Sequence, residues 1–160
     1  MVENNKKLLI KLVFLVSIIA LVSAFFIEYI LGHQPCNLCI FERFPYMLAI
    51  IIIIFNYKFS HLEKFFILLL TIIFLAGTAL SLYHLGIEQS FIQESLLCDL
   101  KSGSNLLSKE EILKQLQEKS ISCKDVTFKI FGLSLTSYNI LVSLLISVST
   151  GKIYLNYDKN

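Results

Sequence analysis

Two cysteines three positions apart carry the most reactive chemistry in this sequence. Residues 32–45 read GHQPCNLCIFERFP and contain Cys36, Cys39, Glu42 and Arg43. A CxxC spacing permits a small disulfide ring and often accompanies a lowered thiol pKa, so it is typical of a redox pair. In a helical register Arg43 lies one turn after Cys39, where a guanidinium would stabilise a thiolate or donate to a ligand oxygen. The alternative is an interfacial arginine paired with Glu42 or a lipid phosphate.

A second pair of cysteines, Cys98 and Cys123, lies far along the chain in a polar segment. An even cysteine count in an oxidising compartment predicts disulfides, and a bridge across this long loop could be a plain stabiliser worth ~3 kcal/mol. A zinc site is the other alternative, but structural zinc usually takes two close-spaced pairs. His33 and His84 stand at no familiar metal spacing, so we predict no metal site.

Long apolar runs must position these cysteines. The chain has 160 residues, of which 56% are hydrophobic, and its mean hydropathy is +0.72. Segments of ~20 apolar residues are long enough to cross a bilayer. We therefore predict an all-α membrane protein, a single domain over residues 1–160 folded as a four-transmembrane-helix bundle. The expected spans are residues 8–31, 40–58, 65–85 and 135–155.

The second span is the least obvious of the four. Uncharged sequence runs only over residues 44–57, which is short for a crossing. A helix that starts near Cys39 or Ile40, with Arg43 at the boundary, reaches ~20 residues. If this segment did not cross, the two cysteine pairs would lie on opposite sides of the membrane. Four crossings place all the cysteines on one face.

Charge predicts which face this is. Four crossings put both chain ends on the same side, and the short flanks there are rich in lysine: Lys6, Lys7, Lys11, Lys58, Lys64, Lys152 and Lys159. The opposite short loop, residues 32–39, contributes only one basic residue, Arg43, which lies just after it. The long loop, residues 86–132, holds six lysines against seven acids. The positive-inside rule therefore predicts cytoplasmic termini. A formal charge of +2 without a basic cluster argues against nucleic-acid binding, so the expected partner is the lipid bilayer.

Three further features qualify this arrangement. The sequence SKEE at residues 108–111 is a capping box that predicts a short amphipathic helix ending near Lys119, suited either to a membrane surface or to a solvated spacer.

Small residues in the third span, including Gly77 and Ser81, predict close approach of another helix. His84 near the end of that span is either an interfacial residue or a hydrogen-bonding partner for a polar head group that enters from the bilayer.

These motifs resemble the DsbB family of disulfide bond formation proteins. The resemblance covers nearly the whole chain: PCNLCIFER opens the second span, YHLGIEQ ends the third, LLCDL and SCKDVTF carry the second cysteine pair, and FGLSLTSYN enters the fourth span.

The resemblance implies a thiol:quinone oxidoreductase of the bacterial inner membrane, with its cysteine loops in the periplasm. A thiol of a reduced DsbA-like, thioredoxin-fold protein would attack Cys98 of a Cys98–Cys123 disulfide. Cys123 would then exchange with Cys36 and free Cys39 beside ubiquinone or menaquinone from the membrane pool. Arg43 and His84 are the residues expected to bind the quinone.

Two other functions remain open on the sequence alone. A DsbI-like relative would keep the chemistry but serve a dedicated partner. A structural membrane protein would use loop disulfides only as braces. Trapping of a mixed disulfide at Cys98 would separate these possibilities.

Overall fold

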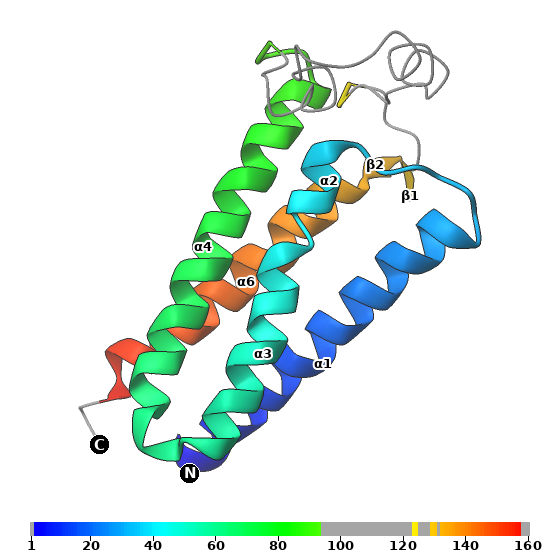
Figure 1. Ribbon diagram of the computed structural model, residues 1–160. Coiled ribbons are helices and arrows are strands. Elements are labelled where there is room, and N and C mark those ends of the chain that lie inside the picture. Colours follow the sequence, from blue (N-terminus) through cyan, green and yellow to red (C-terminus); the bar gives the residue numbers. More distant parts are fainter. Residues whose placement is uncertain (1, 94–122, 125–128, 131, 158–160) are drawn as a thin grey trace, which may run out of the picture.

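The computed structural model describes residues 2–93, 123–124, 129–130 and 132–157. Among these residues, four stretches of helix are long and apolar enough to cross a membrane. They are α1 (Val2–Tyr29), the pair α2 (Asn37–Phe41) and α3 (Phe44–Lys58), α4 (Glu63–Glu88) and α6 (Leu135–Leu155). Figure 1 shows them as one bundle, with the start of α1 and the end of α6 at the same end. The predicted four-helix membrane fold is confirmed, and α2 lies at the opposite end from the termini.

The second crossing contains a break that the sequence analysis did not predict. It starts at Asn37 rather than near residue 40, and a turn at Glu42 and Arg43 separates α2 from α3. Pro45 sits in the first turn of α3, where its missing amide donor leaves no intrahelical bond unmade. A one-turn 3₁₀ helix, η1 (Ser60–Leu62), leads into α4.

A ladder of hydroxyl groups joins α4 to α6, which form the most extensive interhelical contact in the bundle. The hydroxyls of Thr71 and Thr150 are 3.0 Å apart, and those of Thr78 and Ser143 are also 3.0 Å apart. Each of these side chains also bonds to a backbone carbonyl one turn earlier in its own helix. In a bilayer, apolar side chains gain little free energy by contacting another helix instead of lipid. Hydroxyl pairs of this kind therefore help to hold the helices together.

The apolar core is formed by α1, α3 and α4, with Ile146 of α6. Phe74, Ile53 and Ala49 are fully buried there, and Tyr46 packs edge-on against Phe74 with ring centroids 5.5 Å apart. The outer faces of all the spans carry exposed large apolar side chains, as expected for helices that face lipid.

The chain just before α6 forms a small hairpin that the all-helical prediction did not include. Strand β1 (Lys129–Ile130) pairs antiparallel with β2 (Leu133–Ser134), and Gly132 between them has a φ of +82°. Ser134 then caps α6, because its side chain accepts a hydrogen bond from the Ser137 backbone amide. The short helix predicted over residues 108–119 lies outside the described residues.

Gly77 lies at a close approach between α4 and α3, as the small-residue pattern predicted. A Cβ added there would lie 3.0 Å from Cγ of Pro45, whose ring cannot rotate away. Gly151 in α6 would meet only Thr71 at 3.4 Å, which is an ordinary contact. We expect Gly77→Ala to cost about 1 to 3 kcal/mol through overpacking, whereas Gly151→Ala gains helix propensity. Thermal unfolding in detergent tests this, and a Gly77→Ala variant as stable as Gly151→Ala would contradict it.

Candidate active site

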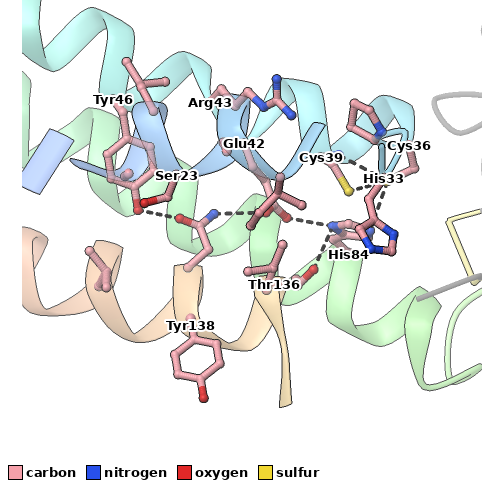
Figure 2. A pocket seen from close by; sticks show the side chains of 18 of the residues that line it. Ser23, His33, Cys36, Cys39, Glu42, Arg43, Tyr46, His84, Thr136 and Tyr138 are labelled. Atoms are coloured by element: carbon pink, nitrogen blue, oxygen red, sulfur yellow. Dashed lines mark hydrogen bonds and ion pairs between the residues drawn. The ribbon is translucent and has the colours of Figure 1, made fainter. Parts of the chain in front are cut away.

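Cys36 and Cys39 lie at the start of α2 because Cys36 acts as the cap of this helix. Its backbone is extended, with φ −69° and ψ 167°, and its sulfur accepts a hydrogen bond from the Cys39 backbone amide at 3.3 Å. The capping turn folds the chain back so that the two sulfur atoms approach each other (Figure 2). Both residues are thiols in this structure, and their Sγ atoms are 2.7 Å apart.

The environment of Cys36 favours its protonated form. The hydrogen bond with Cys39 and the burial of the side chain, which is 7% exposed, raise the pKa of the Cys36 thiol well above its usual 9.0. The contact with His84 opposes this shift without cancelling it. The expectation that the CxxC motif would lower its thiol pKa is therefore wrong for Cys36. This thiol cannot become a nucleophile at neutral pH unless a neighbouring group accepts its proton.

We expect alkylation of Cys36 in the reduced protein to be slow at neutral pH and to accelerate only above pH 9, because the thiol with a raised pKa stays protonated below it. Cys39→Ala removes the largest cause of the shift and should move the reactivity profile of Cys36 to lower pH. Iodoacetamide labelling followed by fragment mass spectrometry measures both profiles. Fast labelling of wild-type Cys36 near pH 7 would contradict the assignment.

His84 lies beside this thiol and is almost completely buried, at 1% exposure. Its Nε2 is 3.5 Å from the Cys36 sulfur, and its Nδ1 is 2.8 Å from Oε1 of Glu42 and 3.3 Å from the Thr136 hydroxyl. The helix α4 runs three residues further than the expected span, to Glu88, and His84 lies on its buried face. His84 is thus buried among protein groups, and its contact with a polar head group from the bilayer stays a prediction.

Glu42 connects His84 to a polar network at the turn between α2 and α3. Its second carboxylate oxygen accepts a hydrogen bond from the Asn139 amide at 3.1 Å. The Asn139 side chain in turn contacts the Ser81 hydroxyl at 2.7 Å and accepts a hydrogen bond from Tyr46 at 2.5 Å. Figure 2 shows this chain of contacts running from Tyr46 to His84. A carboxylate that is only 8% exposed is stabilised by such a set of donors.

Arg43 pairs with Glu28 and not with its neighbour in the sequence, Glu42. Its guanidinium donates to Glu28 of α1 at 2.5 Å and lies 5.1 Å from the centre of the Phe25 ring. The alternative in which Arg43 pairs with Glu42 is therefore wrong, and Glu28 has the polar partner that a carboxylate in a membrane span needs. Arg43 has five N–H donors, so the ion pair leaves donors available to a ligand.

A cavity of about 350 Å³ brings these groups together. Its walls are mostly apolar and come from one face of α1, the chain around Cys36 and Cys39, and the start of α6. Arg43, Glu42 and His84 supply polar groups in the wall. Ligand sites in proteins typically measure about 300 to 1,000 Å³, are mostly apolar and carry a few polar groups, as this cavity does.

The cysteine and histidine atoms are close enough to raise the question of a metal. The sulfur atoms of Cys36 and Cys39 and a ring nitrogen of His84 all lie within 4.8 Å of one another. Two thiolates on one tetrahedral zinc ion are about 3.8 Å apart, given Zn–S bonds of about 2.3 Å. The observed 2.7 Å between the sulfur atoms is much shorter than this and does not fit two ligands of one zinc ion. The geometry thus fits a dithiol with an adjacent base better than it fits a zinc centre.

Of the second cysteine pair, the structure describes Cys123. Cys123 is buried at 3% exposure, packs in one cluster with Cys36, Leu38 and Ile87, and lines the same cavity. The structure therefore brings a residue of the long loop to the CxxC motif, which the exchange between Cys123 and Cys36 requires. Cys98 lies outside the described residues.

Several polar residues of the site did not stand out in the sequence. Thr136 and Asn139 lie one turn apart in LTSYN, and Glu88 follows His84 by one turn. Their helical spacing, in segments that face the bundle interior, was the available signal. From sequence, Glu42 is expected only as a partner for Arg43.

Comparisons with known proteins agree with the chemistry of this site. The family model for disulfide bond formation protein DsbB matches residues 6–152. An uncharacterized protein of Rickettsia prowazekii (strain Madrid E), RP370, is 35% identical over 163 residues, which cover 99% of this chain and 92% of that protein. No solved structure matches the chain. On the extent of the family match, this chain is a multi-pass membrane protein that belongs to the DsbB family.

Proposed function

We propose that this protein oxidises the two thiols of a DsbA-like, thioredoxin-fold partner and passes the electrons to a membrane quinone. Membership of a disulfide-formation family supplies the general activity, that of a thiol oxidoreductase with a disulfide-handling partner. The specific partner and the electron acceptor are the proposal. The observation that carries it is a CxxC motif in the wall of an apolar cavity, within a bundle of membrane-spanning helices.

The cavity supports a quinone as the acceptor. A quinone has a flat apolar ring with two carbonyl oxygens, and it reaches the protein through the bilayer. The apolar walls suit the ring, and the guanidinium of Arg43 can donate to a carbonyl oxygen as negative charge develops there. Cys39 lies in the same wall and is the thiol closest in sequence to Arg43. Ubiquinone and menaquinone both meet this description.

The proposed route conserves electrons and protons. A partner thiolate attacks Cys98 of a Cys98–Cys123 disulfide and releases the Cys123 thiolate. Cys123 attacks the Cys36 sulfur of the Cys36–Cys39 disulfide and releases Cys39. The second partner thiol then displaces Cys98, which leaves an oxidised partner. Cys98 displaces Cys36 from Cys123 and restores the loop disulfide. Two electrons and two protons from the resulting Cys36–Cys39 dithiol go to one quinone, which becomes the hydroquinone.

The charge distribution supports a location in a bacterial inner membrane with the site on the periplasmic side. Lys6, Lys58, Lys64 and Lys152 lie in or beside the helix ends opposite α2. Lys64 stacks over Tyr154 at 5.7 Å from the ring centre, an arrangement typical of a membrane–water boundary. By the positive-inside rule, this supports a cytoplasmic location for this end and an oxidising compartment for the cysteines.

A reconstituted assay tests the proposal. The purified full-length protein in detergent is mixed with a reduced DsbA-like protein and either ubiquinone-1 or a soluble menaquinone analogue. We expect catalytic loss of partner thiols matched one for one, per dithiol, by quinone reduction. Partner oxidation without quinone reduction would reject the acceptor, and quinone reduction with dithiothreitol but not with the partner would indicate a dedicated partner instead.

A further inference from the structure

The hydrogen bonds around His84 identify which ring nitrogen carries the proton. Thr136 donates its only hydroxyl proton to Oε1 of Glu88, at 2.6 Å. Its oxygen can therefore only accept from Nδ1 of His84, at 3.3 Å. The carboxylate of Glu42, which contacts the same nitrogen at 2.8 Å, is also an acceptor. Nδ1 is thus protonated, and in the neutral ring Nε2 has a free lone pair that faces the Cys36 sulfur.

Two carboxylates are placed to stabilise this ring once it becomes positively charged. Glu42 contacts the Nδ1 side, and Oε1 of Glu88 lies 3.8 Å from Nε2. The Glu88 side chain is 6% exposed, and its Oε2 has no hydrogen-bond partner among the described residues. A buried carboxylate oxygen without a donor is costly, and a proton arriving on Nε2 would give it a cation nearby.

The Cys36 thiol needs such an acceptor. Its sulfur is already 2.7 Å from the Cys39 sulfur, the atom to which it must bond when the disulfide re-forms. Its raised pKa keeps it protonated at neutral pH. Within the described part of the site, His84 Nε2 is the basic atom that contacts this sulfur.

We propose that His84 is the general base for Cys36: Nε2 takes the thiol proton as the Cys36–Cys39 bond forms, and Glu42 and Thr136 hold the ring in the accepting tautomer. The inference rests on the proposed function, because quinone accepts the electron pair. In this assignment His84 is a catalytic residue, while Glu42 and Thr136 are positioning residues. It replaces the expected role of His84 as a quinone ligand, since both of its nitrogens are already engaged.

The step balances. The S–H bond of Cys36 breaks, its proton moves to Nε2, and its electron pair forms the bond to the Cys39 sulfur. The two electrons released by the Cys36–Cys39 dithiol reduce the quinone. The proton on His84 and the proton of the Cys39 thiol complete the hydroquinone, which returns His84 to its neutral form.

Several groups that titrate or carry charge could influence the pH dependence of this step. Those that contact the ring or line the same cavity are Cys36, Cys39, Glu42, Glu88, Cys123, His33, Tyr46, Tyr138 and Arg43, the last paired with Glu28. Of these, Cys36, Glu42 and Glu88 lie within 4 Å of a ring nitrogen.

Single-turnover reduction of ubiquinone-1 by the prereduced full-length protein, followed from pH 6 to pH 9, tests the base. With His84→Gln we expect a loss of about 10²-fold at pH 7. The remaining rate should rise tenfold per pH unit, because the Cys36 thiolate must then form by simple ionisation below its pKa. The wild-type rate should depend less steeply on pH. Equal rates and equal slopes in wild type and His84→Gln would overturn the proposal.

The roles of Glu42 and Thr136 in holding the His84 ring are tested with milder substitutions. Glu42→Gln should lose about tenfold, with partial recovery in Glu42→Asp, and Thr136→Val should be slower than Thr136→Ser. Glu63→Gln, the same change at the distant end of α4, is the matched control and should behave as wild type. A Thr136→Val variant that matches Thr136→Ser in rate and pH slope would remove Thr136 from the assignment, even if Glu42→Gln failed to fold.

A second readout separates this inference from the proposed function. His84→Gln should shift the alkylation profile of Cys36 to higher pH whether or not quinone is the acceptor, because the variant has no base at Nε2 to take the proton of that thiol. If the wild-type protein reduces no quinone but the shift appears, the acceptor is wrong and the base stands. If quinone is reduced but neither the slope nor the alkylation profile changes, the base is wrong.

Discussion

Cys98→Ser is expected to abolish oxidation of the DsbA-like partner while leaving oxidation of dithiothreitol through Cys36 and Cys39 intact. The partner is proposed to attack the sulfur of Cys98, and a serine oxygen forms no disulfide, so the rate should fall by at least about 10³-fold. Dithiothreitol is small enough to reach the CxxC pair directly. The reconstituted assay with each reductant in turn measures the two rates.

Cys39→Ser is the matched comparison. It should abolish quinone reduction with both reductants, since the electron pair has no second thiol from which to leave. If Cys98→Ser still oxidised the partner, Cys98 would not be the point of attack. If Cys39→Ser still reduced quinone, the order of the two pairs in the relay would have to be reversed.

Arg43→Ala is expected to slow quinone reduction by about 10²-fold, the usual loss when a donor to a developing oxyanion is removed. The same change would also break the ion pair with Glu28, whose side chain is 22% exposed. A structural effect must therefore be separated from a chemical one. Single-turnover rates for Arg43→Ala, Arg43→Lys and Glu28→Gln make that separation.

Glu28→Gln removes the charge pairing but keeps the guanidinium beside the cavity. If Arg43 acts on the acceptor, Glu28→Gln should lose far less activity than Arg43→Ala. Arg43→Lys should lie between them, because an ammonium keeps the charge but lacks the planar set of donors. Equal losses in Glu28→Gln and Arg43→Ala would mean that Arg43 serves to hold α1 against the start of α3.

The elements of the fold were predictable because each membrane span has to satisfy length and hydropathy within itself. The apolar run before Tyr29 and the small residues around Gly77 each carry their own signal. The break between α2 and α3 has no such signal in the sequence, because Glu42 and Arg43 are equally compatible with the boundary of one continuous helix. Their side chains diverge toward Asn139 and Glu28, and these partners are distant in the sequence.

The candidate site was predictable to the extent that its chemistry lies in one motif. CxxC identifies the redox pair, and a charged residue one turn later suggests a role for Arg43. His84 falls inside the predicted span, but Glu88 lies beyond its predicted end, and helix ends are poorly determined by sequence. The network of Glu42, Thr136 and Asn139 forms only when three separate spans meet, so no single stretch of sequence reveals it.

The hydroxyl ladder between α4 and α6 has a consequence for the kinetics of exchange. It fixes His84 and Thr136 side by side, although about fifty residues of chain separate them. The segment that carries Cys98 and Cys123 is therefore tethered at both ends beside the CxxC motif, and Cys123 is only twelve residues from the start of α6. A short tether of this kind gives an effective concentration in the millimolar range. Exchange between Cys123 and Cys36 should then be first order and independent of protein concentration, so that among the thiol–disulfide exchanges only the encounter with the soluble partner is slowed by dilution.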